Sequence, residues 1–389
     1  MDTMRPFQLE RFFSKYEFSA KHLLCASDCE SMSVRELLAF DAGREAGGAE
    51  GLLDLRLGYT ETRGSPALRR DIAALYAEGS RGGPGPEGIF VHAGAEEAVL
   101  NFCLATINPG DRVIVNEPAY QSLSELPRWR GAELDSWRVR EDGSRWFLDP
   151  DELGRLLSKK TKAVIINLPH NPTGALATRG EFEAIVSHCR KAGVILFVDE
   201  VYRHLELKES RRLPPACEAY ENGVSLNVLS KSAGLAGLRL GWLATRRADI
   251  LEAVAVVKDY NSICASAPSE YLAGIAVRNF EAITAKNRRL CADNLALLEA
   301  FVARHPDFIS WVPPEASSIG FPRLAGRAEL DFASDAEAMA LRLLEDRGVL
   351  LLPGAYYGYD RRHFRIGYGR ASMVEALVRL ERWVEKLGY

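Results

Sequence analysis

The chain has 389 residues, of which 47% are hydrophobic and 26% charged, with a formal net charge of −4. This length suits one large domain or two smaller ones with a well-filled core. The near-neutral charge and the lack of a long basic run give no reason to expect a nucleic-acid partner. No apolar run reaches the roughly 18 residues that a membrane-spanning helix needs, so no membrane partner is expected either.

The cysteines and the first residues predict a cellular compartment. Seven cysteines, an odd number, are spread along the chain. The closest two, Cys25 and Cys29, have no partner pair nearby, so neither a zinc site nor any other metal site is expected. Residues 1–10 contain no apolar signal core. We therefore expect a reduced, cytoplasmic protein.

The first half of the chain alternates helical and strand patterns. A helix is predicted from Pro66, which occupies its first turn. Amphipathic segments such as 179–192 separate most of the short apolar runs that follow. Strands that are apolar on both faces and spaced by helices indicate a mainly parallel sheet covered by helices on both faces. The predicted strands are 89–91, 112–115, 162–168, 193–198, 224–229 and 240–244.

The pattern changes after about residue 269. Long helical stretches are predicted over 269–304, and a terminal amphipathic helix over 373–387. Strands are predicted between them, near 317–323, 348–353 and 363–367. We expect a large α/β domain over 46–268 and a smaller α+β domain over 269–389, with an N-terminal segment, 1–45, that packs with the small domain.

One lysine follows a buried strand and lies in a turn broken by glycines. Lys231 ends the apolar run from Ser225 and has no acidic residue beside it in the sequence. Desolvation there would lower the lysine pKa and make the neutral amine a Schiff-base nucleophile. Arg239, eight residues later, offers a fork of donors suited to a phosphate. The pair suggests pyridoxal phosphate, although a lysine in a Ser-Lys-Ser turn is more often a surface residue.

Two polar residues follow other strands of the predicted sheet. The carboxyl ends of parallel strands are where ligands bind in open α/β sheets. Asp199 could keep a pyridine nitrogen protonated there, or it could simply cap the next helix. Asn171 lies between two prolines that fix the backbone, so its amide could face a ring substituent. A plain Asn-Pro turn is the alternative.

Two further segments suit a phosphate and a flat ring. Gly94, Ala95 and Glu96 link a strand to a helix, and small residues at a helix N-terminus let backbone N–H groups approach a phosphate. Many strand–helix turns contain Gly-Ala, so this segment alone is weak evidence. Tyr120 follows another strand and could stack on a ring or serve in packing alone.

Together these motifs resemble fold-type I pyridoxal-phosphate enzymes, and specifically the class I/II aminotransferase family, over about residues 50–370. Each motif alone is common, but their order and spacing match the family. The set comprises Tyr59 with Gly64, Gly94 to Glu96, Pro118 to Tyr120, Asn171 to Gly174, Asp199 to Tyr202, Ser230 with Lys231, Arg239, and Phe364 to Ile366.

The resemblance implies a role for each residue around pyridoxal 5′-phosphate. Lys231 would bind the cofactor covalently and Asp199 would pair with the ring nitrogen. Tyr202 and Asn171 would hydrogen-bond the ring 3′-oxygen, with Tyr120 stacked on the ring. Lys231, Asp199 and Tyr202 are therefore the expected catalytic residues.

The resemblance also implies how the phosphate and the substrate are held. Arg239, Ser230 and the amides of Gly94 to Glu96 would hold the phosphate, while Tyr59 would reach the cofactor phosphate of a partner subunit. That implies a homodimer with shared active sites. Arg365, with Asn171 beside it, would bind the substrate α-carboxylate through a bidentate pair.

One position departs from the family pattern. Many relatives have Ser or Thr three residues before the lysine as a phosphate ligand, and this chain has Val228. Either the Ser230 hydroxyl takes that place, or the phosphate is held with one bond fewer.

The implied reaction is transamination between an L-amino acid and a 2-oxo acid. A narrower resemblance to the capreomycidine-synthase-like branch implies an alternative, a lyase or cyclase acting on a hydroxylated arginine-like amino acid. The branch motifs are 118–124, 167–174, 352–354 and 365–369. A third interpretation is a non-catalytic ligand sensor. Such sensors usually carry a DNA-binding domain, for which the forty-odd residues before the core are too few. The presence of Lys231 also argues against a purely binding role.

Overall fold

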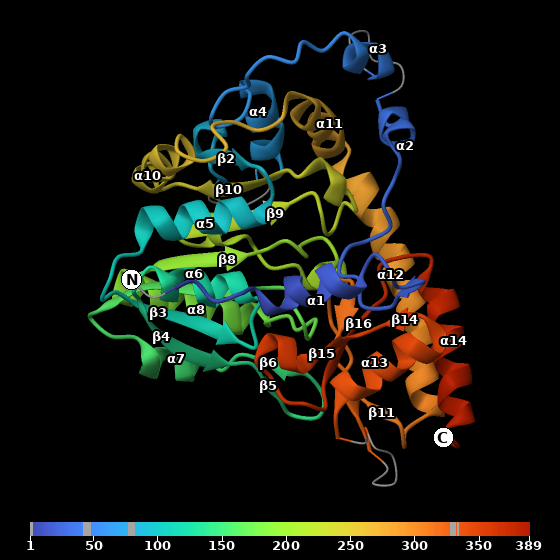
Figure 1. Ribbon diagram of the computed structural model, residues 1–389. Coiled ribbons are helices and arrows are strands. Elements are labelled where there is room, and N and C mark those ends of the chain that lie inside the picture. The colour runs from blue at the N-terminus through green and yellow to red at the C-terminus, as the bar shows by residue number, and fades with distance from the viewer. Residues whose placement is uncertain (1–2, 42–47, 77–81, 327–331, 333) are drawn as a thin grey trace.

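The computed structural model describes residues 3–41, 48–76, 82–326, 332 and 334–389. A seven-stranded sheet runs through the larger part of the molecule, in the order β2-β10-β9-β8-β7-β3-β4 (Figure 1). Only β10 is antiparallel to its neighbours, which confirms the mainly parallel sheet. Its strands are β2 (Ile89–His92), β3 (Arg112–Glu117), β4 (Glu133–Arg138), β7 (Thr161–Asn167), β8 (Ile195–Asp199), β9 (Gly223–Val228) and β10 (Gly241–Thr245).

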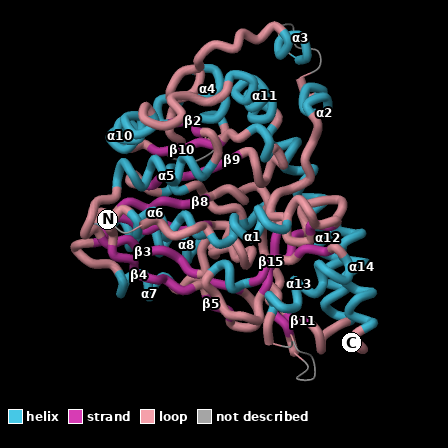
Figure 2. Tube along the Cα trace, in the orientation of Figure 1, coloured by secondary structure: helices cyan, strands magenta, loops and turns pink. Residues whose placement is uncertain are grey.

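Helices cover both faces of this sheet (Figure 2). Successive side chains of a strand point to opposite faces. In β3, Val113 and Val115 accordingly join one apolar cluster, while Ile114 joins another. The first cluster includes α5 (Ala95–Thr106), α6 (Gln121–Trp129) and α10 (Ala248–Lys258), and the second includes α7 (Pro150–Leu156) and α8 (Arg179–Ala192).

Most elements of this part agree with the sequence prediction. Helix α8 covers the predicted 179–192; it begins with a capping box between Thr178 and Glu181 and ends at Gly193 in the left-handed region. Helix α4 (Pro66–Ala74) begins at the predicted proline. Strand β4 was not predicted, because it is a mostly polar edge strand without an apolar run.

The predicted helical stretch consists of two helices, α11 (Ala267–Arg278) and α12 (Phe280–Arg304), with a break at Asn279. Helix α11 packs against α4 and shares an apolar cluster with β2 and β10 of the large sheet, whereas α12 packs against α14 of the smaller part. A three-stranded sheet, β12-β16-β15, packs with α13, and α14 packs against α12 and α13. The remaining elements here are β11 (Ile309–Ser310), β12 (Ile319–Gly320), β13 (Arg323–Leu324), α13 (Ala336–Arg347), β14 (Val349–Leu350), β15 (Leu352–Pro353), η4 (Gly354–Tyr357), β16 (Phe364–Gly367) and α14 (Met373–Lys386).

Part of the N-terminal segment lies against the smaller part, while Arg5 and Gln8 bond residues of α6 in the large part. Strand β1 (His22–Leu23) pairs in parallel with β14, and the Phe12 ring of α1 (Gln8–Tyr16) lies 4.6 Å from that of Tyr356. The expected boundary between residues 45 and 46 falls outside the described residues, and the division into domains stays a prediction. Short elements complete the chain: α2 (Val34–Ala39), α3 (Gly48–Leu53), η1 (Pro86–Gly88), β5 (Arg140–Glu141), β6 (Trp146–Phe147), η2 (Glu209–Arg211), α9 (Ala216–Ala219) and η3 (Ala236–Leu238).

Candidate active site

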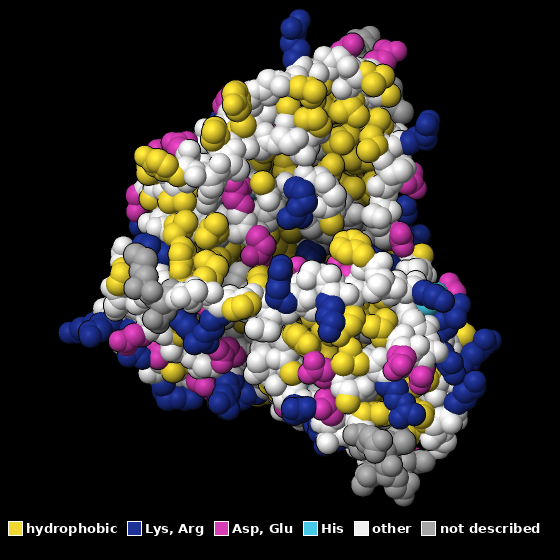
Figure 3. All heavy atoms as spheres, in the orientation of Figure 1, with side chains coloured by type: hydrophobic (Ala, Val, Ile, Leu, Met, Phe, Trp, Pro, Cys, Tyr) yellow, Lys and Arg dark blue, Asp and Glu magenta, His cyan; other side chains and the backbone are white. Residues whose placement is uncertain are grey.

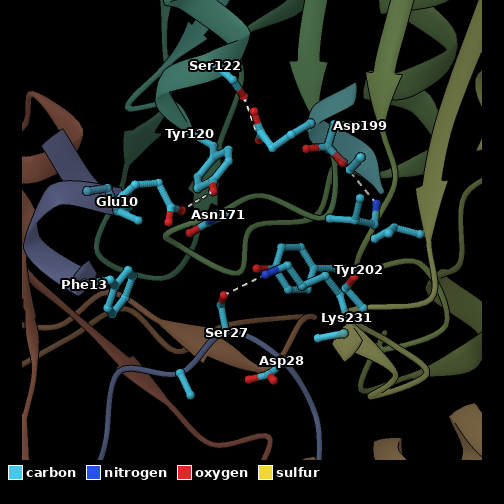
Figure 4. A pocket seen from close by; sticks show the side chains of 18 of the residues that line it. Glu10, Phe13, Ser27, Asp28, Tyr120, Ser122, Asn171, Asp199, Tyr202 and Lys231 are labelled. Atoms are coloured by element: carbon cyan, nitrogen blue, oxygen red, sulfur yellow. Dashed lines mark hydrogen bonds between the residues drawn. The ribbon is translucent and has the colours of Figure 1, made fainter. Parts of the chain in front are cut away.

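A cavity of about 440 Å³ lies where the strands of the large sheet end, between them, α1 and the smaller part (Figure 4). Its volume is within the usual range of small-molecule sites. Ten of the twelve residues predicted for the site line this one cavity. They are Ala95, Glu96, Tyr120, Asn171, Asp199, Tyr202, Ser230, Lys231, Arg239 and Arg365.

Lys231 reaches the cavity from the turn after β9. Its ammonium nitrogen donates to the Ser27 hydroxyl at 3.0 Å, a contact drawn in Figure 4. Desolvation lowers the lysine pKa and the nearby Arg365 lowers it further, while Asp28 and Asp199 oppose the shift. A lysine with a depressed pKa is more readily the neutral amine that nucleophilic or base chemistry requires.

Asp199 is the last residue of β8 and is 7% exposed. One carboxylate oxygen accepts from the Val201 backbone N–H at 3.2 Å. Burial raises the pKa of Asp199 to about 7, because desolvation penalises its charged form. A protonated ring nitrogen beside it would return the carboxyl to its charged form, so the group suits a pyridinium partner.

Arg365, on β16, is 2% exposed, and its hydrogen-bond partners among the described residues are all neutral. Its Nη1 donates to the Tyr357 hydroxyl at 2.5 Å. Its Nε and Nη2 donate to the Cys25 carbonyl at 3.0 and 2.7 Å. The Tyr357 hydroxyl in turn donates to the Asn171 side-chain oxygen at 2.8 Å. A buried guanidinium without a bonded anion is costly, so this one is prepared for an anionic ligand such as a carboxylate.

Gly94 and Arg239 form another corner of the site. Gly94 is the N-cap of α5 with φ 92°, and it provides no side-chain cap, so the first N–H groups of the helix remain available. A Cβ on Gly94 would lie 2.6 Å from Arg239 Nη2. The absence of a side chain therefore lets the guanidinium approach the helix N-terminus, and both features favour a phosphate.

Two buried hydroxyls in the cavity lack a hydrogen bond among the described residues. Tyr202 is 1% exposed, and its hydroxyl makes no hydrogen bond there. Ser230 is 6% exposed and its hydroxyl is also unpartnered. Unpartnered buried hydroxyls are costly unless a ligand satisfies them. Together with the charged groups above, they fit a pyridoxal phosphate, and Val228 brings no hydroxyl to the same wall.

The Glu96 carboxyl lies in the same cavity, near the N-terminus of α5. It accepts a hydrogen bond from the Ser122 hydroxyl at 3.0 Å, and burial raises its pKa to about 7. Tyr120 also faces the cavity, and its hydroxyl donates to Glu10 of α1 at 2.8 Å (Figure 4). The sequence predicted Glu96 as a phosphate ligand through its backbone amide. It did not predict the buried carboxyl group of this residue.

Sequence reasoning missed several residues of this cavity, most of them from the N-terminal segment. Helix α1 is amphipathic, with Leu9 and Phe12 buried, and this spacing could have placed Glu10 near its inner face. No motif signals the others. The missed lining residues include Glu10, Phe13, Glu17, Cys25, Ser27, Asp28 and Arg370, together with Tyr357 behind Arg365.

Tyr59 is the predicted residue that lies away from the cavity. It is 90% exposed and does not line the cavity of its own chain.

The described residues contain no group of three or more His, Cys, Asp or Glu that could hold a metal ion. Over the same residues, no helix combines the length and apolar character needed to span a membrane.

The family profile described as aminotransferase class I and II matches residues 23–380. The chain belongs to this family. Class I and II aminotransferases depend on pyridoxal phosphate, so the protein is a pyridoxal-phosphate-dependent aminotransferase by family and an enzyme by class. The family also accounts for the fold, a type I aminotransferase architecture.

Three relatives illustrate the range of this aminotransferase family. A crystal structure of a pyridoxal-phosphate-dependent aminotransferase from Streptococcus suis 89-1591 superposes with a TM-score of 0.90 at 29% identity, over 99% of both chains. The capreomycidine synthase of Streptomyces vinaceus is 30% identical over 92% of this chain and 88% of its own length. The structure of the pyridoxal-phosphate-dependent cyclase OrfR has a TM-score of 0.85 at 27% identity, over 98% of both chains.

Proposed function

We propose that this aminotransferase exchanges an amino group between an L-α-amino acid and a 2-oxo acid in the cavity around Lys231. One arrangement carries the proposal: the buried Arg365, whose partners within the described part of the chain are neutral, faces the same cavity as Lys231 and Asp199. Pyridoxal phosphate, when bound, supplies an electron-accepting ring that stabilises negative charge at the substrate α-carbon.

Each residue has a distinct task in this proposal. Arg365 binds the α-carboxylate, and Tyr357 fixes the guanidinium so that the amino acid is oriented. Lys231 would hold the cofactor covalently, and its Nζ, when neutral and free, would take the substrate α-proton as general base. Ser27 is placed to hold that nitrogen in reach. Asp199 keeps the ring nitrogen protonated.

The remaining polar groups hold the cofactor. Arg239, the first N–H groups of α5 from Gly94 to Glu96, and the Ser230 hydroxyl bind the phosphate. The unpartnered Ser230 hydroxyl supports the view that it takes the place left by Val228. Tyr202 and Asn171 would donate to the ring 3′-oxygen, and Tyr120 would pack against the ring.

We further propose a homodimer in which Tyr59 of each subunit completes the site of the other. Tyr59 is nearly fully exposed in the single chain, as are Leu57 at 81% and Tyr260 at 91%. Apolar side chains gather on this part of the surface, over α10 and α11 (Figure 3). Large exposed apolar patches mark interaction surfaces. A second copy of the chain would cover the patch and place Tyr59 at a neighbouring phosphate.

A cytoplasmic location is proposed from the thiols. All seven cysteines are free, and Cys29 and Cys291 lie 3.8 Å apart, sulfur to sulfur, without a disulfide. Cysteines that stay as free thiols are typical of a protein in a reducing compartment. Fractionation of the source cells with an antibody to the protein tests this proposal; recovery outside the cytoplasm would contradict it.

A second candidate is a lyase or cyclase acting on a hydroxylated arginine-like amino acid. The similarity to capreomycidine synthase over most of both chains favours it. Lys231, Asp199 and Arg365 would serve both reactions, since each begins with removal of the α-proton. The similarity to an aminotransferase structure over 99% of both chains supports transamination as the first candidate.

One experiment separates the two candidates. Holoenzyme is mixed with a single amino acid and no 2-oxo acid, and the cofactor is extracted after one turnover. Transamination leaves the cofactor in its amine form and releases one equivalent of 2-oxo acid. A cofactor recovered as the aldehyde, together with a dehydrated or cyclised amino acid, would overturn transamination in favour of the lyase or cyclase.

A further inference from the structure

The side of the cavity that faces away from the sheet is formed by α1 and is acidic. Glu10, Phe13 and Glu17 follow one another at intervals of three and four residues, which places them on one face of the helix and its C-cap. All three line the cavity, and Figure 4 shows Glu10 and Phe13 turned towards it from α1. Two carboxylates therefore flank an aromatic ring above the substrate site.

The cations of the cavity are already committed elsewhere. Arg370 makes a two-point contact with Asp28, at 3.0 and 2.7 Å, so this pair is neutral. In the proposed function, Arg365 takes the α-carboxylate and Arg239 the phosphate. Glu10 accepts only from the Tyr120 hydroxyl, and Glu17 has no hydrogen bond or ion pair from its carboxylate among the described residues.

The acidic groups also repel one another. Burial raises the pKa of Glu17, and the charges of Asp28 and Glu10 raise it further, against the opposing effect of Arg370 and Arg365. A cation between these carboxylates would relieve the repulsion, whereas a second carboxylate would increase it. These carboxylates line the same cavity as Lys231 and Arg365, so a substrate held there by its α-carboxylate extends its side chain within the space that they border.

We propose that Glu10 and Glu17 select an amino acid whose side chain ends in a cation, an ammonium or a guanidinium group. The inference rests on the proposed function, because it takes the Arg365 end of the cavity as the position of the α-carboxylate. The Phe13 ring lies between the two carboxylates and already faces the Arg365 guanidinium, 5.6 Å from its centroid. Its remaining surface suits the alkyl stem of such a side chain. The selected substrates are therefore basic L-amino acids.

The test compares L-arginine with L-citrulline, which replaces the guanidinium by a neutral ureido group of nearly the same shape. Binding to holoenzyme is measured by calorimetry and by the change in cofactor absorbance, and turnover is measured separately by 2-oxo acid release. We expect L-arginine to bind at least about tenfold more tightly than L-citrulline, which corresponds to one satisfied charge pair. L-Glutamate should bind more weakly than both.

Variants locate the effect on α1. Glu17→Gln keeps the shape of the side chain and removes its charge, so the ratio of L-arginine to L-citrulline affinity should fall about tenfold, mostly through KM and with little change in kcat. Glu10→Gln should act in the same direction. Glu299→Gln, on the exposed face of α12, is the matched control and should leave the ratio unchanged.

The outcomes are separable. Equal affinity for L-arginine and L-citrulline, or a preference for L-glutamate, would overturn the inference whatever the reaction. Preferential binding of L-arginine that depends on Glu17, without release of a 2-oxo acid, would support the inference and overturn transamination. An unchanged ratio in both glutamine variants would show that α1 does not select the side chain.

Discussion

Two regions meet at the cavity, and they differ in how their residues are brought there. On one side, Asp199 ends a strand of the large sheet, Asn171 and Lys231 come shortly after two others, and these neighbouring parallel strands place them together. On the other side, Glu10, Ser27 and Tyr357 come from opposite ends of the chain. The strand ends carry groups for chemistry, while the second region positions the lysine and the substrate. Loss of a residue from the first region should therefore abolish turnover, and loss of one from the second should change affinity.

The largest effect is expected at Lys231. Lys231→Ala removes both the covalent hold on the cofactor and the general base, so turnover should fall at least a thousandfold, within the range for loss of a positioned base. Borohydride reduction of the parent holoenzyme, followed by peptide mapping, should place the pyridoxyl group on Lys231. Lys286→Ala, at an exposed position of α12, should remain active. A pyridoxyl group on any other lysine would remove Lys231 from the site.

Asp199→Asn should lower turnover by about a hundredfold while the cofactor stays bound, because an amide cannot keep the ring nitrogen protonated. Glu200→Gln is a matched comparison. Burial raises the pKa of Glu200 to about 7 as well, but this carboxyl faces the Ala216 N–H and the Ser225 hydroxyl instead of the cavity. Glu200→Gln should lower the free energy of unfolding measured in urea, while turnover per folded molecule is retained. Similar turnover in both variants would contradict the role of Asp199.

Tyr357→Phe tests the second region. The substitution removes the hydroxyl between Arg365 and Asn171, so KM for the amino acid should rise about tenfold, with little change in kcat, as expected for loss of a hydrogen bond to a charged group. Tyr356→Phe is the control, since that hydroxyl bonds Glu337 instead. A fall in kcat with unchanged KM would show that Tyr357 belongs with the chemistry of the first region.

The smallest effect is expected at Tyr59. Tyr59→Phe should weaken cofactor retention about fivefold, the value of roughly one hydrogen bond. The decisive measurement mixes Tyr59→Phe with Lys231→Ala protein under subunit exchange. Heterodimers should regain fully native sites, because each site draws the two residues from different chains. Averaged behaviour of the two parents, despite proven exchange, would contradict the shared site.

The sequence by itself determined the sheet and the side of the cavity that it supplies. Buried parallel strands need continuous apolar runs, and these are visible in the sequence without knowledge of the fold. The residue that directly follows each run must lie at the same edge of the sheet. Lys231, Asp199 and Asn171 could be predicted for this reason, and short motifs around Gly94 and Arg239 added the phosphate end. Strand β4 was missed because an edge strand can be polar.

The tertiary structure alone decided which residues face these groups from the other side. Helix α1 and η4 are separated by more than three hundred residues in the chain, and their contact depends on packing that no local pattern encodes. The bonds from Tyr357 to Asn171, from Lys231 to Ser27 and from Tyr120 to Glu10 also join residues that are far apart in the chain, and they depend on packing of the same kind. Local periodicity reports which face of an element is buried, but not what lies against it.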